Sequence, residues 1–151
     1  DDGSFNPQGA INRAESLKVL LEALGEDIDT SECASDFSDV LPNAWYSCYV
    51  NLGKELGIVQ GYGDGTFRPG STVNQVELLK IAFESFGIDL SEYSVTDLPE
   101  GADENAWYAV YLQYALDNDL IDEDMVNAAM GMTREEFSEV VYRLIQQQES
   151  L

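Results

Sequence analysis

The sequence contains no histidine, and its seven lysine and arginine residues face 29 aspartate and glutamate residues. The missing histidine removes the commonest general base and the commonest zinc ligand. The net charge of −22 argues against nucleic-acid binding, because phosphate contacts need a basic surface. The same charge fits a soluble extracytoplasmic or salt-adapted surface. No apolar run is long enough to span a bilayer and no signal peptide is recognisable, so we expect no membrane insertion.

Only two cysteines are present, Cys33 and Cys48, and they do not form a CxxC motif. Without histidine, a cysteine-based zinc site is not expected. A disulfide would clamp the loop before Phe37 to the segment that carries Trp45, and would contribute about 3 kcal/mol in the loop-entropy model. The alternative is a pair of buried free thiols. The sequence leaves both states open.

An internal repeat is the strongest signal that is present. The segment from Gly57 to Lys80 begins with a glycine-rich turn, Gly61 to Thr66, and continues into a helix. Its features recur at an offset of 62 positions in pairs such as Phe5 with Phe67, Lys18 with Lys80 and Trp45 with Trp107. Such periods indicate units that stack on one another to bury their apolar faces.

The repeats divide the chain into three parts: 1–29 as the second half of repeat 1, 30–91 as repeat 2, and 92–151 as a divergent repeat 3. Because the chain starts inside a repeat, we expect a mature product or an excised fragment. Helical periodicity predicts an all-α fold without strands. The expected helices span about 13–24, 44–56, 75–86, 106–118 and 134–147, with a short helical turn at 125–130. The expected inward side chains are Val19, Leu20 and Ala23, widened by Leu17, Leu21 and Leu24, and in the later helices Tyr49, Leu52, Gly53, Leu56, Tyr111, Tyr114, Ala115, Phe137, Val140, Val141 and Leu144.

Three of the expected helices begin with the same pattern, an Asn or Thr followed three positions later by Glu. This is the pattern of a capping box, in which the first side chain and the Glu each bond the other's backbone N–H. The pattern gives these residues a structural role and requires no catalytic one. The capping pairs are Asn12 with Glu15, Asn74 with Glu77, and Thr133 with Glu136.

The residue after each cap is Arg13, Gln75 or Arg134. A cation is unfavourable at the first helical position, beside the positive end of the helix dipole. One interpretation is a salt bridge to a carboxylate of a neighbouring repeat. The other is an anion site, in which a guanidinium and free N–H groups at the helix start hold a carboxylate or phosphate. In the second case Gln75, which has no charge, marks the weakest site.

Two aromatic pairs, Trp45-Tyr46 and Trp107-Tyr108, precede or open two of the expected helices. We expect one ring of each pair in the core and the other partly exposed. Core packing of both is one interpretation, and stacking of an exposed ring on the apolar face of a sugar is the other. Asp64 and its neighbours do not match the spacing of an EF-hand calcium loop. We expect no cofactor. A weak calcium site formed by oxygen ligands stays open, and the sequence does not identify a metal.

In their order along the chain, these motifs resemble the S-layer homology (SLH) domain. The matching segments are Phe37-Ser38-Asp39-Val40, Trp45-Tyr46, the turn from Gly57 to Pro69, and Asn74-Gln75-Val76-Glu77. The resemblance implies a pseudo-threefold bundle of helix–loop–helix repeats. It also implies grooves between repeats that hold cell-wall polysaccharide, often carrying acidic ketal-pyruvate groups, with the arginine of the helix start as a ligand contact.

Arg13 and Arg134 match that arginine, and Gln75 departs from it. Repeat 3 also departs from the family pattern: it lacks the glycine-rich turn and has Glu135 in place of alanine. The resemblance predicts a location at the cell surface or in the envelope. The full set of candidate ligand-binding residues is Arg13, Arg134, Gln75, Trp45, Trp107, Tyr62 and Arg68.

The leading functional hypothesis is a non-catalytic module that anchors a protein to cell-wall polysaccharide or another surface glycan. The alternative is a structural module that packs against other surface-layer chains. An enzyme is disfavoured, since no pair of carboxylates stands out for acid–base work.

Overall fold

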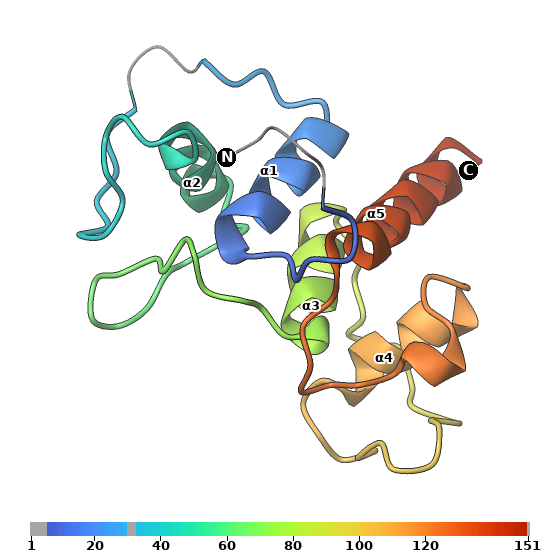
Figure 1. Cartoon of the computed structure of the whole chain (residues 1–151). Coiled ribbons are helices and arrows are strands. Elements are labelled where there is room, and N and C mark those ends of the chain that lie inside the picture. Colours follow the sequence, from blue (N-terminus) through green and yellow to red (C-terminus); the bar gives the residue numbers. More distant parts are fainter. Residues whose placement is uncertain (1–5, 30–32, 151) are drawn as a thin grey trace. The chain divides into compact units, whose positions relative to one another are not determined.

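A computed structural model describes residues 6–29 and 33–150 (Figure 1). Within these residues the chain is helical and forms no strand, which confirms the all-α prediction; only isolated bridges join extended segments. The helices are α1 (Arg13–Ala23), α2 (Ser47–Glu55), α3 (Gln75–Ser85), α4 (Ala109–Asp117), the 3-10 helix η1 (Glu123–Met125) and α5 (Arg134–Glu149).

The described residues form two compact units. The first unit comprises residues 11–72, in which α1 packs against α2. The second comprises residues 6–10 together with 73–150, in which α3 packs against α4. The sequence repeats end at 29 and 91, so the units cut across them: a helix and the turn of the following repeat belong to the same unit.

All three capping boxes form, each with bonds in both directions. At α1, Asn12 Oδ1 accepts from the Glu15 N–H at 2.9 Å, and Glu15 Oε2 accepts from the Asn12 N–H at 3.0 Å. The same reciprocal bonds join Asn74 with Glu77 and Thr133 with Glu136. These pairs therefore satisfy backbone groups at the helix starts and set where each helix begins.

The cores follow the expected apolar stripes with a small rotation. In α1 the large buried side chains are Leu17, Leu20 and Leu21, as expected, whereas Val19 and Ala23 are only half-buried. In α2, Val50 and Gly53 are buried and Leu56 is exposed, contrary to expectation. Gly53 is required at this crossing because a Cβ there would collide with the side chain of Leu17. The expected inward residues of α5 are all buried: Phe137, Val140, Val141 and Leu144.

Two helices begin later than predicted. The segment before α2 consists of tight turns, and the Ser47 hydroxyl donates to the carbonyls of Pro42 (3.0 Å) and Ala44 (2.7 Å). The helix therefore begins at Ser47 and not at Ala44, and α4 likewise begins at Ala109 and not at 106. Trp45 and Trp107 consequently lie in the turns that lead into the helices.

The two interhelical linkers are held by different bonds. Cys33 and Cys48 form a disulfide, with their Cα atoms 5.0 Å apart, which ties the loop before Phe37 to α2. In the second unit the buried Gln113 ties the linker to α4, because its Oε1 accepts from the N–H groups of Thr96 (3.0 Å) and Asp97 (2.9 Å). Of the two cysteine states left open by the sequence, the structure has the disulfide.

Repeat 3 replaces the glycine-rich turn by a shorter segment. Asp119 has a φ of 53° at the position where Gly57 has a φ of 76° after α2, so a side chain occupies a conformation that favours glycine. Arg143 donates to the Asp119 carbonyl at 2.5 Å and secures this helix end. The helical turn expected at 125–130 lies earlier, at Glu123–Met125.

The disulfide provides a stability test. Replacing both cysteines (C33S/C48S) removes a crosslink that closes a loop of 15 positions, so we expect a loss of about 3 kcal/mol in the free energy of unfolding. Thermal unfolding followed by circular dichroism measures it. Reductant should lower the melting temperature of the wild type to that of the variant and leave the variant unchanged. Equal melting temperatures of oxidised and reduced wild type would contradict this role.

Candidate ligand-binding site

The start of α1 is closed by the glycine-rich turn that follows α2. The Arg13 N–H donates to the Ser71 carbonyl at 3.0 Å, and the Ala14 N–H donates to the Pro69 carbonyl at 3.1 Å. Because the cap takes the next N–H, no free N–H group remains there for an anion. The prediction that free N–H groups at this helix start would bind an anion is therefore wrong. The start of α5 is closed in the same way, by the carbonyls of Gly9 and Pro7.

The side chain of Arg13 lies over the same turn. Its Nε donates to the Phe67 carbonyl at 2.9 Å, which offsets the unfavourable position of a cation at a helix start. Its Cζ is 4.8 Å from the centre of the buried Phe67 ring and 5.1 Å from that of Tyr62. Within the described part of the chain Arg13 forms no ion pair, so the salt-bridge interpretation does not apply to it.

Arg68 is held in an unusual backbone conformation. Its φ is 60°, in the left-handed region that non-glycine residues seldom occupy. The carboxylate of Asp39 accepts from the N–H groups of both Phe67 (2.8 Å) and Arg68 (2.7 Å) and so fixes this conformation. The Asp of the Phe37–Val40 motif is therefore a positioning residue. Residues in such strained conformations cluster at functional sites.

Arg13 and Arg68 converge on one tyrosine ring. The Arg68 Cζ lies 4.0 Å from the centre of the Tyr62 ring, and Tyr62 is 38% exposed. Asp64 completes the group, with its Oδ2 2.9 Å from an Arg68 nitrogen. We call Arg13, Tyr62, Asp64 and Arg68 the Tyr62 cluster; all four lie in the first unit. The cluster presents two guanidinium groups and an amphipathic ring at the surface.

Hydrogen bonds tune Asp64 within this cluster. The Thr66 hydroxyl donates to Oδ1 at 2.6 Å, Arg68 donates to Oδ2 at 2.9 Å, and the Thr66 N–H donates to Oδ1 at 3.0 Å. These donors, the Thr66 hydroxyl first, lower the pKa of Asp64 from 3.8 to about 2. Asp64 therefore stays ionised and orients Arg68 over the ring at any pH above this value.

Gln75 has a different role from the arginine at the equivalent position. It is only 4% exposed, its Nε2 donates to the Met125 carbonyl, and its Oε1 accepts from the Asn127 N–H, both at 2.9 Å. The amide thus fastens the shortened turn of repeat 3. Since both ends of the amide are used internally, we leave Gln75 out of the proposed ligand site.

Arg134 lies against the backbone before α1. An Nη1 nitrogen contacts the Asn6 carbonyl at 3.5 Å, and Gly9 leaves the space that the guanidinium occupies, because a Cβ there would collide with it. The neighbouring Glu135, where the family pattern has alanine, accepts a bond from Gln8 Nε2 at 2.5 Å. A carboxylate thus follows this arginine in the sequence, whereas Ala14 follows Arg13.

Trp45 and Trp107 are exposed, at 52% and 58%, and their neighbours Tyr46 and Tyr108 are half-buried. The tryptophans therefore supply the exposed rings, but neither tyrosine is a full core residue. Each tryptophan faces a lysine rather than an arginine: Lys18 Nζ is 5.8 Å from the Trp45 ring centre. Sequence reasoning missed the lysines, although Lys18 and Lys80 share the repeat offset.

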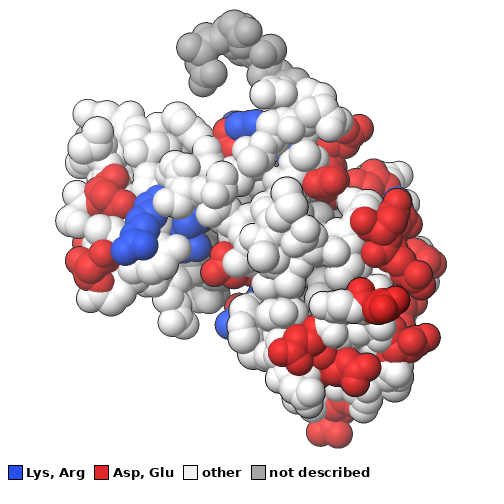
Figure 2. All heavy atoms as spheres, turned by 60° about the horizontal axis from the view of Figure 1, so that its bottom comes forward, with Lys and Arg blue, Asp and Glu red and all other residues white. Residues whose placement is uncertain are grey.

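Charge is distributed unevenly over the surface. Figure 2 shows acidic side chains spread over much of one face and basic side chains in a few places. Within the described residues, no group of three or more Asp, Glu, Cys or His side chains is arranged to hold a metal ion. The weak calcium site stays a prediction.

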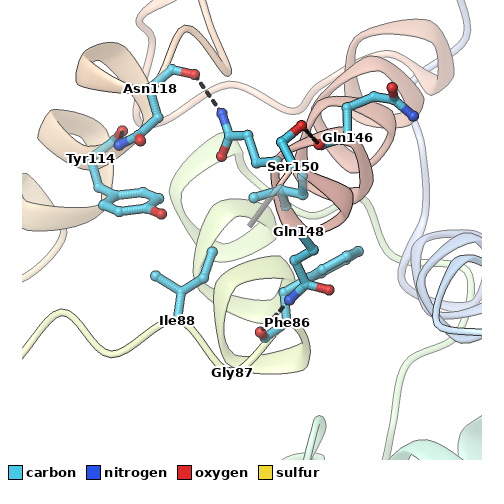
Figure 3. Close-up of a pocket in the computed structure, with 10 residues that line it drawn as sticks. Phe86, Gly87, Ile88, Tyr114, Asn118, Gln146, Gln148 and Ser150 are labelled. Carbon is cyan, nitrogen blue, oxygen red and sulfur yellow. Dashed lines mark hydrogen bonds between the residues drawn. The ribbon is translucent and has the colours of Figure 1, made fainter.

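A pocket of about 670 Å³ lies in the second unit at the ends of α3, α4 and α5 (Figure 3). Phe86, Ile88 and Tyr114 contribute apolar surface to it. Its amide donors are used internally: Gln148 Nε2 donates to the Phe86 carbonyl at 3.0 Å and Gln147 Nε2 to the Asn118 carbonyl at 2.9 Å. These amide groups thus fasten the C-terminal part of α5 to the ends of α3 and α4.

The motifs and the helical architecture agree with the comparisons to known proteins. Residues 36–77 match the model of the S-layer homology domain. The matched residues include Trp45, the glycine-rich turn and the start of α3. In the described part of the chain, none of the helices has the length and apolar character needed to cross a membrane.

Several similar proteins are named for the cell surface or for anchoring. The chain is 27% identical over 151 residues to the Surface-layer 125 kDa protein of Lysinibacillus sphaericus, covering 96% of this chain and 12% of that protein. It is 32% identical over 81 residues to Cell surface glycoprotein 1 of Acetivibrio thermocellus, covering 53% and 4%. It is 29% identical over 104 residues to the Cellulosome-anchoring protein of the same organism, covering 65% and 23%.

The chain therefore spans a small part of the length of these relatives. The domain match and the relatives together indicate a location at the cell surface or in the cell envelope.

The lowered pKa of Asp64 in the Tyr62 cluster leads to a prediction about pH. A carboxylate with a lowered pKa in the folded state stabilises the fold above its unfolded pKa, and this contribution disappears as the pH falls through the folded value. Asp64 should therefore titrate near pH 2 in a carboxyl NMR experiment. In Thr66→Val, which lacks the strongest donor, the midpoint should move toward 3.8. A wild-type midpoint already at 3.8 would contradict the described hydrogen bonds.

Proposed function

We propose that this chain is a non-catalytic anchoring module that binds an acidic cell-wall polysaccharide non-covalently, and that the Tyr62 cluster is its principal contact. The observation that carries the proposal is the convergence of Arg13 and Arg68 on the exposed ring of Tyr62. The chain has only seven basic residues, so two guanidinium groups at one ring are a marked local concentration of positive charge.

The geometry of the cluster suits a sugar that carries a carboxylate. The Nε of Arg13 is fixed by the Phe67 carbonyl, so its terminal nitrogens can donate to an anion in a defined direction. The half-exposed Tyr62 ring can lie along the apolar face of a pyranose, with its hydroxyl at the wet end. Guanidinium groups recognise carboxylates through paired parallel donors, which suits acidic substituents of a wall polymer.

The surrounding acidity makes such binding selective. A net charge of −22 repels a polyanion from most of the surface, so the polymer can approach only where positive charge is concentrated. Added salt screens both the repulsion and the attraction over distances of about 8–10 Å. The SLH match and the names of the relatives, which include a Cellulosome-anchoring protein, support the anchoring role.

We also propose the pseudo-threefold arrangement of repeats, with ligand grooves between them. Three equivalent junctions support it, each within a single unit. Isolated antiparallel bridges pair Asn12 with Thr72, Asn74 with Gly131, and Thr133 with Ala10. In each case the N-cap residue of a helix pairs with a residue in the turn of another repeat, as a cyclic arrangement requires.

The arginine mechanism is tested by Arg13→Ala and Arg68→Ala. Each change removes charge-assisted hydrogen bonds that contribute about 1.5–3 kcal/mol, so we expect roughly tenfold or greater weakening. Calorimetric titration with purified wall polysaccharide measures the affinity. Arg143→Ala is the matched control, because Arg143 is occupied by Glu139 and the Asp119 carbonyl. Unchanged affinity in both variants, with melting temperatures showing that they are folded, would remove the arginine mechanism.

A second candidate function, self-assembly through protein contacts, is favoured by α5. Tyr142 is 56% exposed, whereas Leu21 and Phe83 at the corresponding helix positions are fully buried. On those helices α2 and α4 cover the equivalent face. Ser138 replaces the leucines found one turn earlier, which makes the face less apolar and this candidate the weaker one.

Light scattering tests the second candidate. If copies of the chain pack through α5, the apparent mass should rise with protein concentration and Tyr142→Ser should reduce the rise. We expect the anchoring function to leave the protein monomeric. A monomer over the whole concentration range for both proteins would count against self-assembly, and an oligomer lost in Tyr142→Ser would favour it.

A further inference from the structure

The tryptophans lie in a second type of surface group, apart from the arginines. In the first unit, Lys18 of α1 has its Nζ 5.8 Å from the ring centre of Trp45 and 5.7 Å from that of Tyr49. Trp45 meets the Tyr49 ring edge-on, with centres 6.3 Å apart. Glu22 lies 3.7 Å from Lys18 and accepts from the Tyr49 hydroxyl at 2.9 Å. The group thus consists of an exposed indole with a lysine and a glutamate beside it.

The second unit contains the same group at the repeat offset. Lys80 Nζ is 5.6 Å from the Trp107 ring centre, and Glu84 lies 3.8 Å from Lys80. Tyr111 meets Trp107 edge-on at 6.0 Å, as Tyr49 meets Trp45. We call the two groups the Lys–Trp platforms; their residues are Lys18, Glu22, Trp45 and Tyr49, and Lys80, Glu84, Trp107 and Tyr111.

The repetition indicates more than general packing. The exposed indoles are 52% and 58% accessible, although burial of a tryptophan is strongly favourable. The lysines and glutamates of both platforms are also about half exposed, at 43–55% of their side-chain surface. An exposed indole with an ammonium group over the ring, and a carboxylate next to that ammonium group, occurs twice.

The platforms differ from the Tyr62 cluster in charge. Each platform pairs one lysine with one glutamate, so its formal charge is zero. The Tyr62 cluster has two arginines and a single aspartate. Asp39 also lies against the backbone of Arg68, but Arg13 forms no ion pair in the described part of the chain and can attract a carboxylate, whereas each platform lysine is paired with its own glutamate.

We infer that each Lys–Trp platform binds a neutral pyranose ring of the same glycan whose acidic groups the Tyr62 cluster holds; this deepens the proposed function and rests on it. The apolar face of the ring stacks on the indole. The ammonium group donates to ring hydroxyls or an acetamido oxygen, and the carboxylate accepts from the hydroxyls. A neutral hydroxyl-bearing ring matches this set of one donor group, one acceptor group and an aromatic face, which an anionic ring does not.

Tryptophan fluorescence gives a direct test, since Trp45 and Trp107 are the two tryptophans of the chain. The whole protein is titrated with a neutral oligomer of N-acetylglucosamine and, separately, with an acidic oligomer of galacturonic acid. The neutral oligomer should produce a saturable change in emission. Trp45→Phe and Trp107→Phe leave one reporter each, and each variant should keep part of the change.

Two pairs of variants locate the binding. Lys18→Met and Lys80→Met remove the ammonium groups but keep apolar stems, and together they should weaken the response to the neutral oligomer severalfold. Arg13→Ala and Arg68→Ala should leave that response unchanged while they weaken binding of the acidic oligomer. Tyr142→Ser serves as a control for an exposed aromatic ring outside the platforms, and should change neither response.

The outcomes separate the two proposals. Binding of the acidic oligomer that depends on the arginines, without any emission change on adding the neutral oligomer, would overturn the platforms and leave the proposed function standing. A neutral response that survives the lysine variants unchanged would also overturn them. An emission change that follows protein concentration without sugar would place the indoles in a contact between copies and overturn the inference. A neutral response without arginine-dependent acidic binding would support the platforms and contradict the cluster.

Discussion

The bonds between the start of a helix and the carbonyls of a distant turn hold each unit together. At α1, two N–H groups donate to Ser71 and Pro69, and Asn12 caps the next. At α5, the carbonyls of Gly9 and Pro7 take the equivalent donors. Helix starts normally leave such donors to water or ligands. Here the fold consumes them, which joins segments far apart in the sequence without a sheet.

This constraint explains why the same position serves different purposes in different repeats. Once the backbone donors are satisfied, the side chain at the first helical position faces the turn. Arg13 meets the Phe67 carbonyl and two aromatic rings. Gln75 meets a shorter turn and is buried by it. The length of the opposing turn, together with the residue itself, decides whether the position can reach a ligand.

Much of the architecture follows from local patterns. The capping boxes and the glycine at the end of α1, with a φ of 74°, fix helix starts and ends that periodicity alone would leave ambiguous. The late starts of α2 and α4 do not follow from periodicity. Before α2 the Ser47 hydroxyl bonds back to its own turn. Before α4 the Ala109 N–H donates to the Ala106 carbonyl within a turn. The close approach of Gly53 to the side chain of Leu17 is a tertiary contact, which helical periodicity does not show.

The sequence indicates several residues of the candidate site, among them Arg13, Tyr62 and Arg68, but not which of them lie together. The offset of 62 indicates the tryptophans, and the capping pattern indicates the helix-start residues. Neither shows that Arg13 and Arg68 face Tyr62 while the lysines face the tryptophans. Those groupings come from where side chains end, several ångströms from the backbone. The role of Asp39 was also hidden, because its partners are backbone amides that lie 28 and 29 positions away.

The division into units determines how this protein should be dissected. The helix of one repeat and the turn of the next belong to the same compact body, so a fragment cut at the repeat boundaries 30 and 91 separates α1 from the carbonyls that close its start. A gene fragment spanning residues 11–72 keeps that closure, the disulfide and the Arg13–Tyr62–Arg68 group on one piece. Fragment boundaries for this chain should therefore be chosen from the hydrogen bonds and not from the sequence repeats.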